Sequence, residues 1–159
     1  MVTISLVSHG HADMIVSLTK SLLKIKEIEK IIVTLNIPEA INLPRSNKIK
    51  LINNITPIGF GHNHNNAFKY SESNYFCVLN PDISIINNPF PVLIEELKSN
   101  NASLVAPLIV SPLGLIEDSI RYFPSISLLL KKLFFSNKGS IVLSDLNNLY
   151  TPDWVAGMF

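Results

Sequence analysis

The apolar residues follow two different periods along the chain, and these periods predict the order of its elements. Short apolar runs rich in β-branched side chains indicate strands. Apolar residues that recur every three or four positions indicate helices, as Met14, Leu18, Leu22 and Ile25 do. The predicted strands cover residues 2–8, 30–36, 48–54, 75–80, 102–110, 116–123 and 153–159, the predicted helices cover 11–25, 61–71, 89–100 and 125–135, and residues 142–152 are mostly loop.

This alternation of strands and helices predicts an α/β fold with a mostly parallel sheet and helices on both faces. The run 75–80 is apolar on both faces, as expected of a central parallel strand. A length of 159 residues suits one domain with a core of its own, so we expect a single domain over residues 1–159.

Composition narrows the class of protein. Hydrophobic residues make up 47% of the chain, charged residues make up 16%, and the formal net charge of +1 argues against a nucleic-acid binder. The single cysteine, Cys77, excludes a disulfide framework and favours a reducing compartment. No apolar run reaches the roughly 18 residues of a membrane span, and the start does not read as a signal peptide. We therefore expect a cytoplasmic protein.

One polar tripeptide, Asn80-Pro81-Asp82, interrupts the apolar sequence where the predicted strand 75–80 ends. Ligands of open α/β sheets bind beyond the carboxyl ends of the strands. Pro81 fixes its own φ and restrains Asn80 to an extended conformation, which would hold Asp82 over that crevice. A lone carboxylate there can bind Mg²⁺ or Mn²⁺ when substrate phosphates supply further oxygens. The alternative is an ordinary turn.

A second polar cluster lies in the sequence NNITPIGFGHNHNNAF, residues 53–68. Gly59 and Gly61 permit positive φ or close backbone approach, and the helix after them offers free N–H groups to an anion. The glycine spacing fits neither a Walker A loop nor a Rossmann fingerprint. The amides of this stretch either contact a ligand or cap and solvate a helix start, and its two histidines lack the further ligands of a zinc site.

Together these pieces resemble the family 2 inverting glycosyltransferases of the GT-A fold, and most closely their bacterial rhamnosyltransferase-like branch. The stretch ISLVSHGHADMIVSLTKSLL is similar to the first strand and helix of that family. GFGHNHNNAF is similar to its Gly-Phe-Gly element, VLNPDI to its Asp-X-Asp metal motif, and DWVAGMF to a strand that borders the acceptor site. The matches are spread in order over nearly the whole chain.

The resemblance implies a role for each matched position. The position matching the metal motif, Asp82, would bind the divalent cation, Mg²⁺ or Mn²⁺, that bridges the donor diphosphate. Asn80 would contact the ribose or the metal shell. The remaining matched residues would lie near the base and ribose (Ser8, His9 and Asn36), on the floor of the nucleotide pocket (Gly59, Gly61 and Asn65) and on the acceptor side (Trp154 and Gly157).

The implied reaction is transfer of a sugar, such as rhamnose, from a dTDP- or UDP-sugar to a saccharide or lipid-linked acceptor, with inversion, in cell-surface polysaccharide synthesis. The family often has an Asp after its second strand, where this chain has Thr34 and Asn36. The general base of the family lies in an acidic segment that would fall beyond Phe159. We therefore expect the chain to be the N-terminal part of a longer transferase, with little transfer of its own and a tendency to self-associate.

Two other classes stay open at this point. One is a sugar nucleotidyltransferase of the same α/β type, which should carry a Gly-rich loop with Arg and Lys for a triphosphate. The other is a non-catalytic nucleotide-binding or interaction module derived from a transferase. In the predicted helix 125–135, Lys131 and Lys132 beside Leu and Phe fit either a helix packed on the sheet or peripheral contact with the inner face of a membrane.

Overall fold

The computed structural model describes residues 1–117, 120–121, 123 and 149–155. These residues fall into two compact units, which divide after Val105. The expectation of a single nucleotide-sugar-binding domain over residues 1–159 stays a prediction, and each unit is described by itself below.

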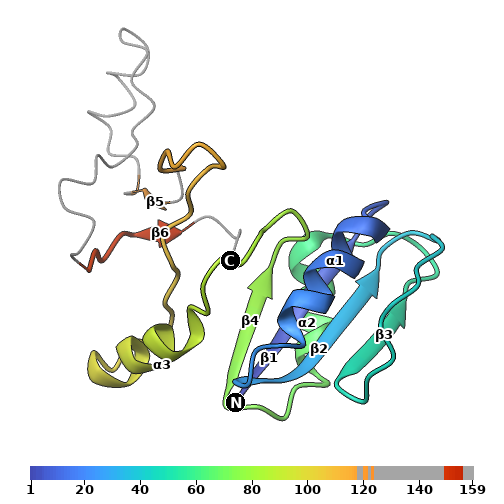
Figure 1. Ribbon diagram of the computed structural model, residues 1–159, viewed down its shortest axis with the longest axis horizontal. Helices are drawn as coiled ribbons and strands as arrows, with labels where there is room; N and C mark the ends of the chain where they lie inside the picture. Colours follow the sequence, from blue (N-terminus) through green and yellow to red (C-terminus); the bar gives the residue numbers. More distant parts are fainter. Residues whose placement is uncertain (118–119, 122, 124–148, 156–159) are drawn as a thin grey trace, which may run out of the picture. The chain divides into compact units, whose positions relative to one another are not determined.

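The first unit is built on a sheet of four parallel strands: β1 (Val2–Ser8), β2 (Ile28–Leu35), β3 (Ile49–Asn53) and β4 (Tyr75–Leu79). Their order in the sheet is β3-β2-β1-β4 (Figure 1). The chain thus moves outward from β1 to β3 and then returns to place β4 on the other side of β1. This reversal creates a topological switch point between β1 and β4, where α/β sheets place their ligands.

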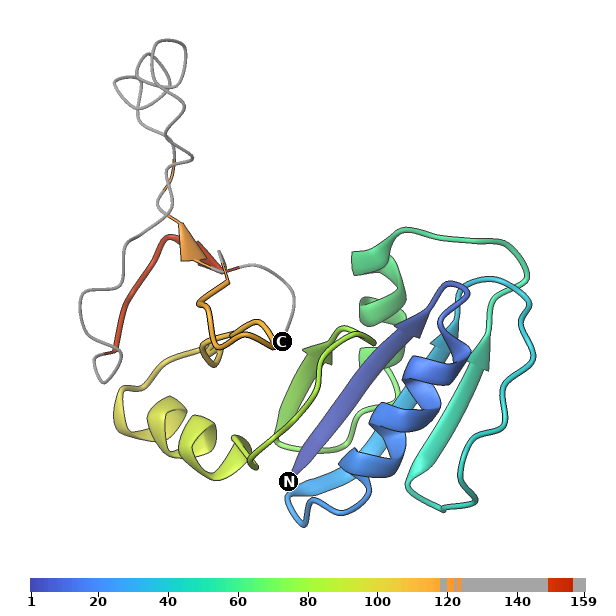
Figure 2. The ribbon, with the colours of Figure 1, turned by 45° about the horizontal axis from the view of Figure 1, so that its top comes forward.

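Helices cover the two faces of this sheet, as the alternation of elements predicts. The helix α1 (Ala12–Leu22) lies on one face and α2 (Phe60–Phe68) on the other (Figures 1 and 2). Successive side chains of a strand point to opposite faces, so Ile4 and Leu6 share one face while Ser5 points to the other. The predicted fold class, a Rossmann-like α/β fold of the GT-A kind, is therefore confirmed.

The α1 face carries the apolar core. Ile4 and Leu6 of β1 are fully buried in one cluster with Ile15, Leu18 and Leu22 of α1. Burying each of these aliphatic side chains contributes roughly 1.5–3 kcal/mol to folding. Met14, which the sequence pattern assigns to the same stripe, is instead 51% exposed, because the buried face of α1 runs through Ile15, Leu18 and Leu22.

The α2 face is packed with polar side chains as well. Ser5 is fully buried, and its Oγ lies 2.8 Å from Nδ1 of His64 on α2. Thr3 donates a hydrogen bond of 2.8 Å to Ser73 Oγ on the same face. Since buried polar groups are costly unless they are paired, these contacts fix how α2 sits on the sheet.

The third helix, α3 (Phe90–Ser99), begins with prolines as predicted, since Pro89 is its N-cap and Pro91 follows in the first turn. Phe90 is buried in the same core cluster as the α1 face, which ties the start of α3 to the sheet.

The predicted strand over residues 102–110 is wrong. The structure has no strand there, only an isolated bridge between Val110 and Ile116. Pro107 has no N–H and would interrupt a ladder in the middle of this run. Leu104 is accordingly 67% exposed.

The second unit comprises the described residues after Val105. Gly114, with φ of +77°, completes a turn that returns the chain at residues 111–115, as the sequence predicts. The strands predicted over 116–123 and 153–159 are present as the short antiparallel pair β5 (Ile120–Arg121) and β6 (Trp154–Val155). The predicted helix 125–135, most of the loop 142–152 and Gly157 lie outside the described residues. Among the helices that the structure describes, none has the length and apolar character needed to cross a bilayer.

Candidate functional site

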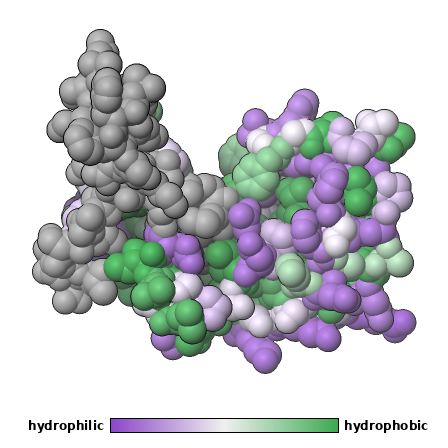
Figure 3. Space-filling view, turned by 90° about the horizontal axis from the view of Figure 1, so that it is seen from above, coloured by the Kyte–Doolittle hydropathy of each residue, from purple (hydrophilic) through white to green (hydrophobic). Residues whose placement is uncertain are grey.

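An open cleft of about 470 Å³ lies at the carboxyl ends of β1, β2 and β4, next to the start of α2. Figure 3 views the molecule from above, onto this end of the sheet, where hydrophilic and hydrophobic residues are interspersed on the first unit. The cleft is lined by residues from all of these elements: Val7, His9, His11, Met14, Asn36, Phe60, Asn63, Asn80, Pro81 and Asp82.

The loop from β1 to α1 forms one wall of the cleft. Gly10 has φ of +84°, a conformation that glycine adopts without strain, and this residue turns the chain between two histidines. The backbone N–H of His9 donates to Nδ1 of His11 at 3.3 Å, and the backbone N–H of His11 donates to Ser8 Oγ at 3.1 Å. Gly10 N–H donates at 3.3 Å to Glu39, which follows β2. The loop is therefore held by its own hydrogen bonds before any ligand arrives.

Asn36, at the end of β2, is the centre of a buried amide cluster that forms the floor. Its Oδ1 accepts hydrogen bonds from the backbone N–H of Ile58 at 2.9 Å, from Asn54 Nδ2 at 3.0 Å and from Asn63 Nδ2 at 3.1 Å. Its Nδ2 donates to the carbonyl of Ile58 at 3.1 Å and lies 3.2 Å from Nδ1 of His9. Asn36 thus joins the ends of β1 and β2 to the loop that leads into α2.

Asn63 completes this cluster from α2. It is fully buried, and its Oδ1 accepts a hydrogen bond of 2.8 Å from Asn54 Nδ2. Its Nδ2 also lies 3.2 Å from the carbonyl of Ile58. These contacts fix the first turn of α2 against the end of β3, and with it the ring of Phe60 that faces the cleft.

The tripeptide Asn80-Pro81-Asp82 forms a turn directly after β4, and the backbone N–H of Ile83 donates to the carbonyl of Asn80 at 3.4 Å. Asp82 is exposed at the rim of the cleft. Within the described part of the chain, its carboxylate makes no hydrogen bond and no ion pair. The turn and the ligand interpretation of this tripeptide are therefore compatible, because the turn leaves the carboxylate accessible.

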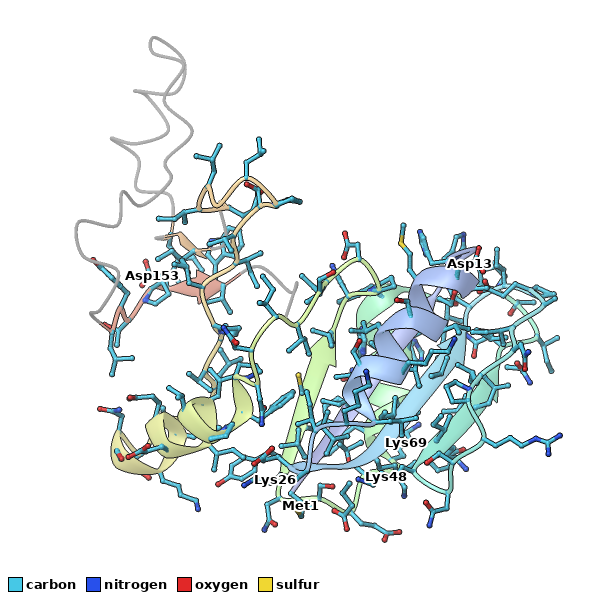
Figure 4. All side chains as sticks on the ribbon, in the orientation of Figure 1. Met1, Asp13, Lys26, Lys48, Lys69 and Asp153 are labelled. Carbon is cyan, nitrogen blue, oxygen red and sulfur yellow. The ribbon has the colours of Figure 1, made fainter. Side chains whose placement is uncertain are left out.

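The charges of the cleft are unusual for a site that would hold a nucleotide. No lysine or arginine is among the lining residues that the structure describes. In Figure 4 the labelled Lys26, Lys48 and Lys69 lie at the amino end of the sheet, whereas Asp13 lies at the carboxyl end. Lys48 is engaged there, since its Nζ donates to the carbonyl of Ile28 at 2.7 Å. A diphosphate in the cleft would therefore need positive charge from elsewhere.

A divalent cation fits that need, with the carboxylate of Asp82 and the side-chain oxygen of Asn80 as oxygen donors of the kind that Mg²⁺ and Mn²⁺ prefer. The described residues contain no group of three or more His, Cys, Asp or Glu side chains that would form a complete protein site. The donor set therefore fits a cation that shares its ligands with substrate phosphates and water.

The structure brings together part of the predicted site. His9, Asn36, Asn80 and Asp82, which come from three different strand ends, line one cleft. Their proposed ligand contacts stay predictions. Ser8 is buried and does not line the cleft: its hydroxyl supports the β1–α1 loop, and its carbonyl accepts the backbone N–H of Asn36.

The other predicted positions lie outside the lining. Gly59 has an extended backbone, and a Cβ at Gly59 or Gly61 would meet nothing within 4 Å, so the fold itself requires glycine at neither. Asn65 is exposed on α2. Trp154 lies in β6 of the second unit. In the same unit, the carboxylate of Asp153 accepts the backbone N–H of Phe123 at 2.7 Å.

Sequence reasoning did not select several of the lining residues as site residues, among them His11, Met14 and Asn63. A signal for Asn63 exists, because residues 60, 63, 64 and 67 repeat at helical spacing and Asn63, His64 and Ala67 form the buried side of α2. That a buried helix face would carry Asn and His could not be inferred from apolar periodicity. His11 and Met14 follow a glycine turn whose direction the sequence does not specify.

His64 belongs to the packing of α2 and not to the cleft. Its ring contacts Phe60 edge to face at a centroid distance of 4.4 Å, and its Nε2 is buried with no hydrogen-bond partner in the described structure. Burial lowers the pKa of His64 to about 4, so the side chain is neutral at physiological pH. This histidine therefore links the position of Phe60, a lining residue, to the sheet.

A curated relative is similar to the chain over its whole length. This relative is the rhamnosyltransferase WbbL of Escherichia coli (strain K12), which is 29% identical over an alignment of 177 residues. The alignment covers 100% of this chain and 65% of the relative, so the chain spans less than two thirds of that protein. No protein-family model and no solved structure matches the chain. The similarity supports a glycosyltransferase-like relationship, in agreement with the α/β fold.

Proposed function

We propose that the chain binds a nucleotide-sugar in the cleft and acts as part of a glycosyltransferase of cell-surface polysaccharide synthesis. The observation that carries this proposal is that Asn80 and Asp82 share a cleft with His9 and Asn36 at the switch point of the sheet. A carboxylate that is exposed and unpaired at this place has no structural task in the described fold. The similarity to a rhamnosyltransferase supports the same class.

The donor in this proposal is a dTDP- or UDP-sugar, with rhamnose as a candidate sugar, and the acceptor is a saccharide or a lipid-linked saccharide. Transfer would proceed with inversion by the family 2 mechanism that the motifs resemble. The proposed location is the cytoplasm, with peripheral contact at the inner face of the membrane if the acceptor is lipid-linked. The general base is not assigned to any residue of this chain.

A divalent cation is part of the proposal. Asp82 and Asn80 would hold it, and when bound it would neutralise the negative charge of the diphosphate leaving group. The protein's own contribution is to fix these two side chains by the Pro81 turn and to place them opposite the β1–α1 loop. The absence of Lys and Arg from the described lining supports a role for the cation in binding the diphosphate.

The absence of Lys and Arg from the described lining also argues against a sugar nucleotidyltransferase, because such an enzyme must neutralise a triphosphate. Metal-dependent nucleotide binding distinguishes the proposal from a pure interaction module, because a scaffold has no need to bind a nucleotide.

Calorimetric titration with UDP and dTDP, with and without Mn²⁺, tests the proposal on the wild type and on Asp82→Asn. We expect binding that needs Mn²⁺ in the wild type and is at least tenfold weaker in the variant. Asp13→Asn is the matched control, because Asp13 is an exposed carboxylate of the same end of the sheet that does not line the cleft. Equal affinities with and without Mn²⁺, or an equal loss in both variants, would reject the role of Asp82.

A further inference from the structure

The two histidines of the β1–α1 loop are held in a defined protonation pattern by the groups around them. A neutral imidazole has one N–H donor and one acceptor nitrogen, and a partner on one nitrogen decides which is which. His9 and His11 both line the cleft, and both side chains are exposed.

The partner of His9 is the amide of Asn36, and the orientation of that amide is fixed by the backbone. Asn36 Oδ1 lies 2.9 Å from the N–H of Ile58, while Asn36 Nδ2 lies 3.1 Å from the carbonyl of the same residue. Turning the amide over would place two donors together and two acceptors together, so only one orientation satisfies Ile58. The group that faces Nδ1 of His9 at 3.2 Å is therefore the NH₂ of Asn36.

Because an NH₂ group can only donate, Nδ1 of His9 must be the acceptor and the proton must lie on Nε2. His11 is constrained in the same way by a backbone group, since the N–H of His9 donates to Nδ1 of His11 at 3.3 Å. Both neutral histidines thus have Nδ1 engaged within the protein, and each has Nε2–H as its remaining hydrogen-bonding group.

We propose that His9 and His11 are pre-set as Nε2–H tautomers and offer two neutral donors to the diphosphate oxygens of the ligand, rather than to the base and ribose that the resemblance implies for His9. This inference rests on the proposed function for the identity of the ligand, but not for the tautomers. Two donors with no free acceptor select oxygens that accept hydrogen bonds, which a diphosphate supplies in excess. They also supply donors in a cleft whose described lining has neither Lys nor Arg.

The tautomers are tested on the free protein by ¹⁵N–¹H correlation spectra of the imidazoles at pH 8. The four histidines are assigned by single substitution, and His62, whose exposed side chain makes no hydrogen bond in the described structure, is the internal control. We expect the proton of neutral His9 and of neutral His11 to lie on Nε2. In Asn36→Ala, His9 should lose this fixed tautomer, and His11 should keep it. A proton on Nδ1 of either residue would overturn the inference and leave the nucleotide proposal intact.

The ligand contact is tested with paired variants. In His9→Asn the side-chain oxygen can replace Nδ1 as the partner of Asn36, but the Nε2–H donor is lost. In His9→Gln the side-chain NH₂ can replace that donor. With Mn²⁺ present, we expect His9→Asn to bind UDP, dTDP and inorganic pyrophosphate about tenfold more weakly than His9→Gln, as one hydrogen bond to a charged acceptor implies.

At His11 we expect the same difference, with His11→Asn binding more weakly than His11→Gln. Equal affinities of the Asn and Gln variants for UDP would overturn the donor role. If the Asn variant loses as much affinity for uridine as for UDP, relative to the Gln variant, the contact is with the nucleoside. That result would overturn the assignment to the diphosphate. If the wild type binds UDP neither with nor without Mn²⁺, the proposed function fails while the tautomers still stand.

Discussion

The side chain of Asn63, in the first turns of α2, donates a hydrogen bond of 3.1 Å to the side chain of Asn36, at the end of β2. Asn63 is fully buried, and Asn36 is 8% exposed. A buried pair of amides between a helix and a strand end is specific, because each amide must find several partners at once. This pair fixes the position of α2 on the sheet and thereby the position of the residues that form the floor of the cleft.

Asn63→Ala should therefore destabilise the fold by about 2–3 kcal/mol, because it removes a hydrogen-bond partner from the buried Asn36 and from the half-buried Asn54. Asn65→Ala is the matched control, since it makes the same change on the exposed side of the same helix and should alter stability by less than about 0.5 kcal/mol. Urea unfolding followed by circular dichroism measures both. Equal free energies of unfolding for the two variants would contradict the role of the amide cluster.

The pKa of His64 predicts how stability changes with pH. Burial lowers this pKa to about 4, from about 6.5 in an unfolded chain. Between these values the unfolded state binds more protons than the folded state, so stability is full above about pH 6.5 and is lost as the pH falls toward 4. This one group can lower the free energy of unfolding by at most about 1.4 kcal/mol per pH unit in that window.

Urea unfolding at pH 7, 5.5 and 4.5 separates His64 from the carboxylates. We expect His64→Gln to lose less stability than the wild type over this range, because the titrating group is gone. His62→Gln, an exposed histidine of the same helix, should follow the wild type. An NMR titration that gave His64 a pKa near 6.5 in the folded protein would refute the prediction directly.

The fold was predictable from sequence wherever one period dominated. The apolar run of β1 and the helical spacing of Leu18 and Leu22 are local signals, and each is matched by an element at that place. The run 102–110 misled the same reasoning, because its composition suits a strand but Pro107 cannot complete a ladder. Apolar pattern alone does not show whether a partner strand is present.

The site was predictable only in part, for a related reason. Asn80 and Asp82 could be placed because a parallel strand must end at the ligand edge of the sheet. The contact between Asn36 and Asn63 joins residues 27 positions apart. It depends on how the loop before α2 folds back over β2, which no local pattern encodes. The positive φ of Gly10 was missed because a single glycine between two histidines belongs to no motif that would indicate its backbone conformation.

Cys77 offers a test of β4 packing that needs no mutation. It is the only cysteine, and burial raises the pKa of its thiol from 9.0 to about 12. Since the thiolate is the reactive form, the folded protein at pH 8 should react with a thiol reagent at least about tenfold more slowly than the unfolded chain, because the smaller thiolate fraction outweighs the higher nucleophilicity of that thiolate. Stopped-flow absorbance with and without urea compares the two rates. Similar rates would mean that the α1 face of β4 is open to solvent.

Gly10 and Gly61 should respond to alanine in opposite directions. Gly10 has φ of +84°, where a side chain is strained even though a Cβ would meet only Ile37 Cδ1 at 3.9 Å. We expect Gly10→Ala to cost about 1–2 kcal/mol of stability. Gly61 lies in the first turn of α2 with nothing within 4 Å of a Cβ, so Gly61→Ala should be neutral or stabilise by up to about 1 kcal/mol.

The loss at Gly10 should extend to ligand binding, because the turn at Gly10 carries His9 and His11. If the strain is relieved by a change of the turn, the hydrogen bond from His9 N–H to His11 Nδ1 is the first contact to be lost. Thermal unfolding with and without UDP and Mn²⁺ measures the change in stability and the change in ligand binding in one experiment. We expect Gly10→Ala to lower the melting temperature and to lose most of the ligand-induced increase, and Gly61→Ala to keep that increase. A Gly10→Ala variant as stable as the wild type, with the full increase, would show that the β1–α1 loop does not need its left-handed turn.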